Sequence, residues 1–223
     1  MFARNSHVYQ FSATSSTLKG GALPNENLDS NLRWTTLTDR LAQISLVPHD
    51  VGGSDDCFFK SVSYQLYETS QLHYEIRMSG IAHLNNHPEL YIESISNNNW
   101  ANYIQQMSNP GTWCDNIIVQ AVANANNCIL HIIESDVNKP QGTTITPTFQ
   151  DNCSRVIFIG YINELHYIST VPDKNSPNRT RLANLKRTLS QSTDQKRAQL
   201  AKRRHSTSVE TIDERQKRLA KLH

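Results

Sequence analysis

The sequence lacks most features of a secreted or membrane-spanning protein. Its 223 residues include only 4 Cys, 8 Gly and 8 Pro. So few cysteines, without a Cys-x-x-Cys pair, exclude a disulfide scaffold and favour a reducing compartment, so we expect a cytoplasmic or nuclear protein. No apolar run approaches the roughly 18 residues of a membrane-spanning helix, and the N-terminus lacks the apolar segment of a secretion signal. We therefore predict no membrane partner.

Charge is small in sum but unevenly placed. The formal net charge is +2, from 22 Lys and Arg against 20 Asp and Glu. Residues 173–223 contain 14 basic and 5 acidic residues, a net +9, which leaves 8 and 15, a net −7, for residues 1–172. The basic segment predicts weak electrostatic contact with nucleic acid, without an aromatic side chain to stack on bases. A solvated helical linker is the alternative interpretation.

Composition divides the chain into three parts. Residues 1–31 are rich in Ser, Asn, Thr and Gly, so we expect a disordered leader. Residues 32–172 contain the periodic hydrophobic segments and are long enough for one core. Residues 173–223 form a basic tail that we expect to be helical or disordered.

Hydrophobic spacing predicts helices in the first part of this domain and strands in the second. The predicted helices cover residues 32–44, 57–67, 73–95 with a break near 85–88, 100–108 and 117–125, and the predicted strands cover 128–133, 155–162 and 165–171. Pro48 with Gly52 and Gly53 predicts a loop, and residues 138–153 predict an irregular connection. This order favours an α/β (α+β) domain with helices packed on a small central β-sheet.

Cys57 is the strongest candidate for chemistry. It begins a predicted apolar helix directly after the loop HDVGGSDD. A thiol at a helix N-terminus feels the positive end of the helix dipole, which lowers its pKa, and an exposed thiol beside loop N–H groups suits nucleophilic attack with oxyanion binding. A buried structural cysteine is the alternative for any single Cys, and the loop favours the nucleophile.

His166 supplies the second predicted catalytic group. It lies in NELHYIST, after a turn and at the start of a strand, and a cysteine hydrolase needs such a histidine within hydrogen-bonding reach of the thiol. Cys128 and Cys153 are predicted core or loop thiols. His83 and His87 have the i, i+4 spacing of a ligand pair but no accompanying third ligand, so we interpret them as surface histidines and predict no metal and no cofactor.

Residues 36–171 resemble the ovarian tumour (OTU) family of cysteine proteases, especially the domains carried by mobile genetic elements of animals. Three segments carry the resemblance in the family's order: GGSDDCFF, GTWCDNIIVQAVAN and HYIST. It implies a papain-like fold and cleavage of ubiquitin, or a ubiquitin-like modifier, from lysine. By the same resemblance Cys57 is the nucleophile, His166 the general base and acid, and Ser54, Asp55 and Asp56 the oxyanion loop. Trp113 and Tyr167 would line the substrate channel, with a core aromatic as the alternative for Trp113.

Four positions depart from the family pattern. Ser54 stands where the family usually has Asp, Asp55 where it has Gly, and Ile168 where an Asp or Asn orients the histidine. Cys114 stands where the family usually has Gly. We expect a substitute for the third catalytic residue among Asp50, Asp55 and Asn163, and count Asp55 among the predicted catalytic residues. The alternative function is a weakly active or inactive OTU-like binding module with a nucleic-acid-binding tail.

Overall fold

The computed structural model describes residues 26–52, 55–95, 99–140, 142–148, 155–177 and 180–191, together with residues 195 and 198. Its elements are, in order, α1 (Glu26–Ala42), β1 (Leu46–His49), α2 (Cys57–Tyr67), α3 (His73–Asn86), η1 (Pro88–Leu90), η2 (Ile92–Ser94), α4 (Trp100–Ser108), α5 (Asn116–Ala125), β2 (Cys128–Glu134), β3 (Gly142–Ile145), β4 (Arg155–Ile162) and β5 (His166–Pro172). Residues 180–191 are also helical. Among the described residues, no helix has the length and apolar character to cross a membrane.

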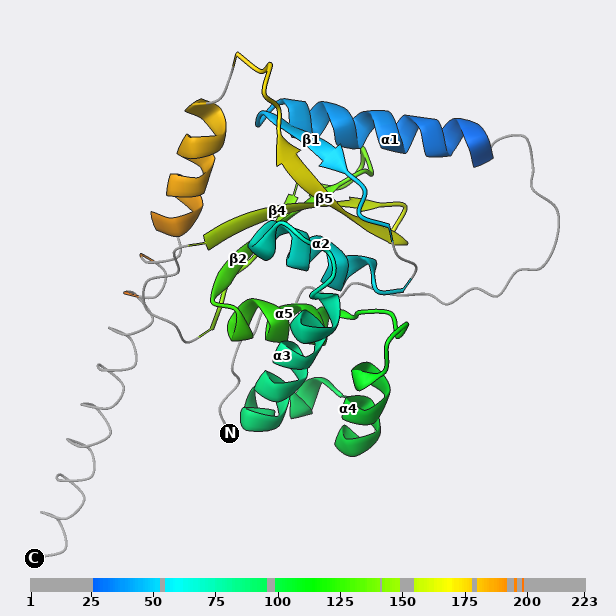
Figure 1. Cartoon of the computed structure of the whole chain (residues 1–223), viewed down its shortest axis with the longest axis vertical. Helices are drawn as coiled ribbons and strands as arrows, with labels where there is room; N and C mark the ends of the chain where they lie inside the picture. The colour runs from blue at the N-terminus through cyan, green and yellow to red at the C-terminus, as the bar shows by residue number, and fades with distance from the viewer. Residues whose placement is uncertain are drawn as a thin grey trace, which may run out of the picture.

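Helices cover both faces of a five-stranded sheet with the order β1-β5-β4-β2-β3. β2 and β4 pair in parallel, and the other pairs are antiparallel. Figure 1 shows α1 along one side of the sheet and α2, α3 and α5 on the other. β2 and β4 are buried along almost their whole length because helices cover both of their faces. The fold class expected from the sequence is therefore confirmed.

Two hydrophobic clusters lie on the two faces of the sheet. The larger cluster contains Cys57, Phe58 and Phe59 of α2 together with apolar residues of α3, α5 and the inner strands. The smaller one packs Leu37 and Leu41 of α1 against the opposite face. The predicted nucleophile therefore belongs to the face covered by α2, α3 and α5.

The edges of the sheet differ from the sequence prediction. β1 contains Pro48, which we had interpreted as a loop residue. Among the described strands β1 pairs with β5 alone, and an edge strand tolerates proline because one row of its backbone groups needs no strand partner. β3 forms the other edge within the stretch predicted to be irregular, pairing with β2. The residues of a short edge strand have a weak preference for strand structure, so whether the segment forms a strand depends on its pairing with the neighbouring strand.

The boundaries of the domain also differ from the prediction. α1 begins at Glu26, inside the segment 1–31 expected to be a disordered leader, and residues 1–25 lie outside the described residues. At the other end, residues 180–191 of the predicted tail form a helix whose Leu182, Leu185 and Leu189 pack against the smaller cluster. Contact of the basic tail with nucleic acid stays a prediction.

Candidate active site

Cys57 and the start of β5 meet at one end of the sheet. Cys57 is the first residue of α2, as predicted, and the N–H of Lys60 donates to the carbonyl of Asp56 to close the first turn. The backbone N–H of Tyr167 donates to Cys57 Sγ at 3.4 Å. Tyr167 follows His166 directly, so the fold brings the predicted nucleophile and the predicted base into the same site.

The Cys57 thiol is not the exposed, acidic group that the sequence predicted. Its side chain is 0% exposed. Burial raises the pKa of the thiol above its ordinary value of 9.0, more than the backbone N–H groups of Tyr167 and Phe58 lower it, and the charge of Asp55 raises it further. The free protein therefore holds Cys57 as a protonated thiol at neutral pH.

His166 contacts a carboxylate that follows β1. Its Nε2 lies 3.2 Å from Oδ1 of Asp50, and the same oxygen accepts a hydrogen bond from the N–H of Gly52 at 2.8 Å. β1 runs antiparallel to β5, with His49 opposite Ser169. The residue after β1 therefore lies beside the beginning of β5, where His166 is placed. The sequence predicts a loop at Pro48, so it offers Asp50 as a candidate but does not predict the strand pairing that places Asp50 beside His166.

Of the three candidates for the orienting group, Asp50 is the one that the structure places on His166. Asp55 is exposed in the turn before α2. Asn163 lies in the turn between β4 and β5, and its buried side-chain oxygen has no hydrogen-bond partner among the described residues. The contact expected of the orienting group is therefore made by Asp50, and a catalytic role for Asp55 or Asp50 stays a prediction. Ile168, which stands at the usual orienting position, is fully buried in the smaller cluster.

In the predicted oxyanion loop, the Asp56 side chain makes contacts that the sequence did not indicate. Ser54 lies outside the described residues. The Asp56 carboxylate binds Arg77 Nη2 at 2.5 Å through Oδ1 and accepts from the N–H of Gly111 at 3.0 Å through Oδ2. No local motif signals Arg77, which lies in the middle of α3, so sequence reasoning missed it.

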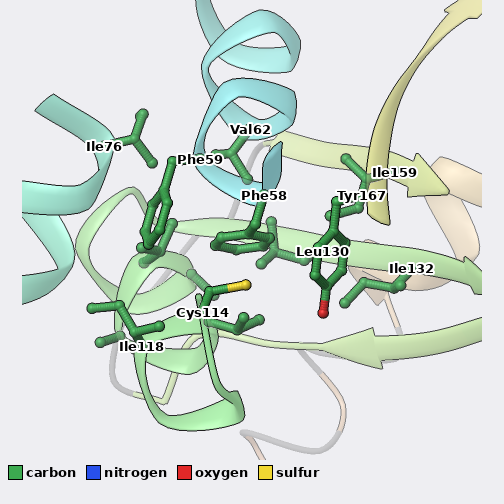
Figure 2. Close-up of a cluster of buried hydrophobic side chains, with 14 of the residues drawn as sticks. Phe58, Phe59, Val62, Ile76, Cys114, Ile118, Leu130, Ile132, Ile159 and Tyr167 are labelled. Atoms are coloured by element: carbon green, nitrogen blue, oxygen red, sulfur yellow. The ribbon is translucent and has the colours of Figure 1, made fainter. Parts of the chain in front are cut away.

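The two aromatic residues predicted to line a channel have different surroundings. Tyr167 is 8% exposed, stacks on Tyr161 at a centroid distance of 4.3 Å and meets the Phe58 ring edge-on at 5.3 Å. Figure 2 shows Tyr167 within the same cluster as Phe58 and Cys114. Tyr167 is thus a core residue beneath the site and not a channel residue. Trp113 is half-buried, with its ring 6.3 Å from that of Tyr167, so it lies between core and surface.

The other cysteines and the pair of His83 and His87 show no arrangement for catalysis or metal binding within the described residues. Cys114 is 4% exposed, and burial raises the pKa of its thiol well above 9.0, with the neighbouring Cys57 adding to the shift. Cys128 is buried in β2, and Cys153 lies outside the described residues. The His83 and His87 rings lie 4.7 Å apart; the His87 side chain is 46% exposed, as predicted for a surface histidine, whereas His83 is partly buried. Within the described residues, no three His, Cys, Asp or Glu side chains gather as metal ligands.

Comparison with known proteins identifies relatives of this domain. A family model described as OTU-like cysteine protease matches residues 53–170, which is 118 of 223 residues. The ovarian tumor domain-containing deubiquitinating enzyme 10 of Arabidopsis thaliana is 28% identical over 131 residues, 59% of this chain and 36% of that relative. Enzyme 9 of the same plant is 29% identical over 157 residues, 70% of this chain and 44% of that relative. The chain thus spans less than half the length of these two curated relatives.

Solved structures support the same fold. The OTU domain of OTUD1 superposes with a TM-score of 0.58 at 16% identity, covering 65% of this chain and 98% of that domain. An OTU domain solved in complex with ubiquitin superposes with a TM-score of 0.50 at 18% identity, covering 68% of this chain and 88% of that one. At these identities the likeness concerns the fold alone.

Proposed function

This chain belongs to the family of OTU-like cysteine proteases, and we propose that it is a thiol isopeptidase that releases ubiquitin or a ubiquitin-like modifier from lysine. The observation that carries the proposal is a pair of contacts at the start of β5: His166 contacts Asp50, and the backbone N–H of the next residue, Tyr167, donates to Cys57 Sγ. The named relatives are deubiquitinating enzymes, and one OTU domain of similar fold was solved with ubiquitin. That a mobile element carries this chain stays a prediction.

Asp50 and His166 have complementary tasks in the proposed reaction. Asp50 accepts a hydrogen bond from the protonated Nε2 of His166, which leaves Nδ1 unprotonated and able to act as the base. That nitrogen takes the proton of Cys57, and the thiolate attacks the carbonyl carbon of the modifier's C-terminal residue. The electron pair of the carbonyl moves to oxygen, and the N–H groups of the loop before α2 stabilise the resulting oxyanion.

The second half of the proposed reaction returns the enzyme to its starting state. The protonated His166 gives its proton to the lysine amine as the bond from carbon to nitrogen breaks, which leaves a thioester on Cys57. A water molecule, deprotonated by His166, attacks the thioester and releases the modifier as a carboxylate and Cys57 as a thiol. Asp50 keeps the imidazole in one orientation through both steps.

The buried thiol requires a change before attack. Cys57 must exchange its contact with the N–H of Tyr167 for the substrate carbonyl, and its proton must pass to His166 because its pKa is raised. We infer that substrate binding opens the thiol, so the free protein is less reactive than the complex. This device would protect a thiol nucleophile from small oxidants and alkylating agents.

The experiment that tests the function is covalent labelling of the full chain by ubiquitin that carries a thiol-reactive group at its C-terminus. We expect one adduct with the wild-type protein, none with Cys57→Ala, and a strongly slowed adduct with His166→Ala. Cys114→Ser is the matched control, because it removes a neighbouring thiol with no proposed role. Folded wild-type protein that forms no adduct with ubiquitin or with a panel of ubiquitin-like modifiers would contradict the proposal.

A further inference from the structure

Arg77 is a charged side chain in the core beside the active site. It is 1% exposed, although burying a guanidinium costs free energy unless every donor finds a partner. Its Nη1 donates to the carbonyl of Met107 at 2.8 Å, and its Nη2 donates to the carbonyl of Thr112 at 2.8 Å. The guanidinium carbon also lies 3.9 Å from the centroid of the Phe59 ring. Arg77 therefore joins α2, α3, the end of α4 and the segment that follows α4.

The fourth partner of Arg77 lies next to the proposed nucleophile. Asp56 directly precedes Cys57, and its Oδ1 is 2.5 Å from Nη2 of Arg77. Its other oxygen accepts from the N–H of Gly111 at 3.0 Å. Gly111 has a φ of +76°, a conformation that favours glycine. One carboxylate thus ties the loop before Cys57 to the 107–112 segment both directly and through Arg77.

Electrostatics keep this link in its ionised form. Burial raises the pKa of Asp56, but the hydrogen bonds from Arg77 and Gly111 and the positive charge of Arg77 outweigh it, so the pKa lies below its ordinary value of 3.8. Apolar residues of similar volume often stabilise a core more than a buried ion pair does. The location of this pair, between the two segments that border the site, therefore suggests a role beyond stability.

We propose that Arg77 is a positioning residue, which acts through Asp56 to hold the backbone of Asp55 and Asp56, directly before Cys57, in the geometry that receives the oxyanion. This inference rests on the proposed function, because only an acyl-transfer reaction forms that oxyanion. Arg77 contacts no substrate in this proposal. Oxyanion donors act only when they are preset at hydrogen-bonding distance from the developing charge. Loss of Arg77 should therefore slow the chemical step more than it weakens substrate binding.

The test compares Arg77→Lys and Asp56→Asn with the wild-type protein on a fluorogenic ubiquitin C-terminal substrate. Lysine keeps the charge but cannot reproduce the planar fork of donors. We expect both variants to lose about tenfold or more in kcat, with KM within about twofold of the wild type. Alkylation of Cys57 by iodoacetamide forms no oxyanion. The alkylation rate of each variant should therefore stay within about twofold of the wild-type rate at every pH.

A matched control separates positioning from stability. Ile81→Val trims a buried apolar side chain one turn beyond Arg77 on the same helix, so it should lower the melting temperature and leave kcat unchanged. If Arg77→Lys does not fold, Asp56→Asn decides. If the wild type is active and the variants keep their kcat, or lose kcat and alkylation rate equally, the positioning role of Arg77 is wrong and the proposed function still stands. A folded wild type that is alkylated at Cys57 but turns over no modifier contradicts the proposed function as well.

Discussion

Asp50 Oδ1 lies 3.2 Å from Nε2 of His166, although 116 positions separate the two residues in the chain. The N–H of Gly52 holds the same oxygen at 2.8 Å, so the carboxylate is fixed before substrate arrives. Asp50 follows β1, and the pairing of β1 with β5 creates the contact. A carboxylate placed in this way can orient His166 in place of the Asp or Asn that the family usually has at the position of Ile168.

Replacing Asp50 is the direct test of this contact. We expect Asp50→Ala to lower kcat/KM by about tenfold or more, because the imidazole loses the partner that sets its tautomer and ring position. Asp55→Ala should lose less, since the Asp55 side chain is exposed and His166 is paired with Asp50. Steady-state kinetics on a ubiquitin C-terminal substrate measure both. A larger loss for Asp55→Ala would restore Asp55 as the orienting residue.

The raised pKa of Cys57 predicts how the alkylation rate of the thiol in the free protein depends on pH. The reactive species is the thiolate, so the rate of alkylation by iodoacetamide should keep rising above pH 9.0. Mass spectrometry of the Cys57 peptide would follow the rate, with the peptide of buried Cys114 as an internal comparison. A rate that levels off near neutral pH would show that the thiolate is already formed in the free protein.

The ion pair of Asp56 and Arg77 predicts a loss of stability in acid. The folded-state pKa of Asp56 is depressed, so the pair contributes stability above pH 3.8 and loses it as the pH falls through the folded value. Asp56→Ala should lower the free energy of unfolding by about 3 kcal/mol near neutral pH, because it leaves a buried guanidinium without its counter-ion. Urea denaturation at several pH values should show this difference shrinking in acid. A difference independent of pH would contradict the ionic origin of the effect.

The helix at residues 180–191 predicts a stability effect without a catalytic one. Its Leu182, Leu185 and Leu189 pack on the cluster of α1, on the opposite face of the sheet from the cluster of Cys57. We expect Leu185→Ala to lower the free energy of unfolding by about 1 to 2 kcal/mol, as suits a half-buried leucine, with kcat unchanged. Thr188→Ala, at an exposed position of the same helix, is the control. A fall in kcat with Leu185→Ala would instead link this helix to the active site.

Local patterns were sufficient for the elements with a strong hydrophobic signal. The predicted bounds of α2, α4 and β4 agree with the structure, and those of α5, β2 and β5 differ by about one residue. Each of these segments has continuous apolar or helical spacing that its own residues define. β1 and β3 were missed because both are short edge strands, one with a proline, and their partners are far away in the chain.

The sequence by itself determined the α/β class, the start of α2 at Cys57 and the histidine that begins β5, because spacing and neighbouring residues encode these features. Only the tertiary structure decided that Asp50 pairs with His166, that Arg77 holds Asp56, and that the thiol of Cys57 is buried. Each of these depends on a distance between segments that come together when β1 pairs with β5 or when α3 packs against α2. Such distances follow from the packing of the whole domain, and no local pattern of residues specifies them.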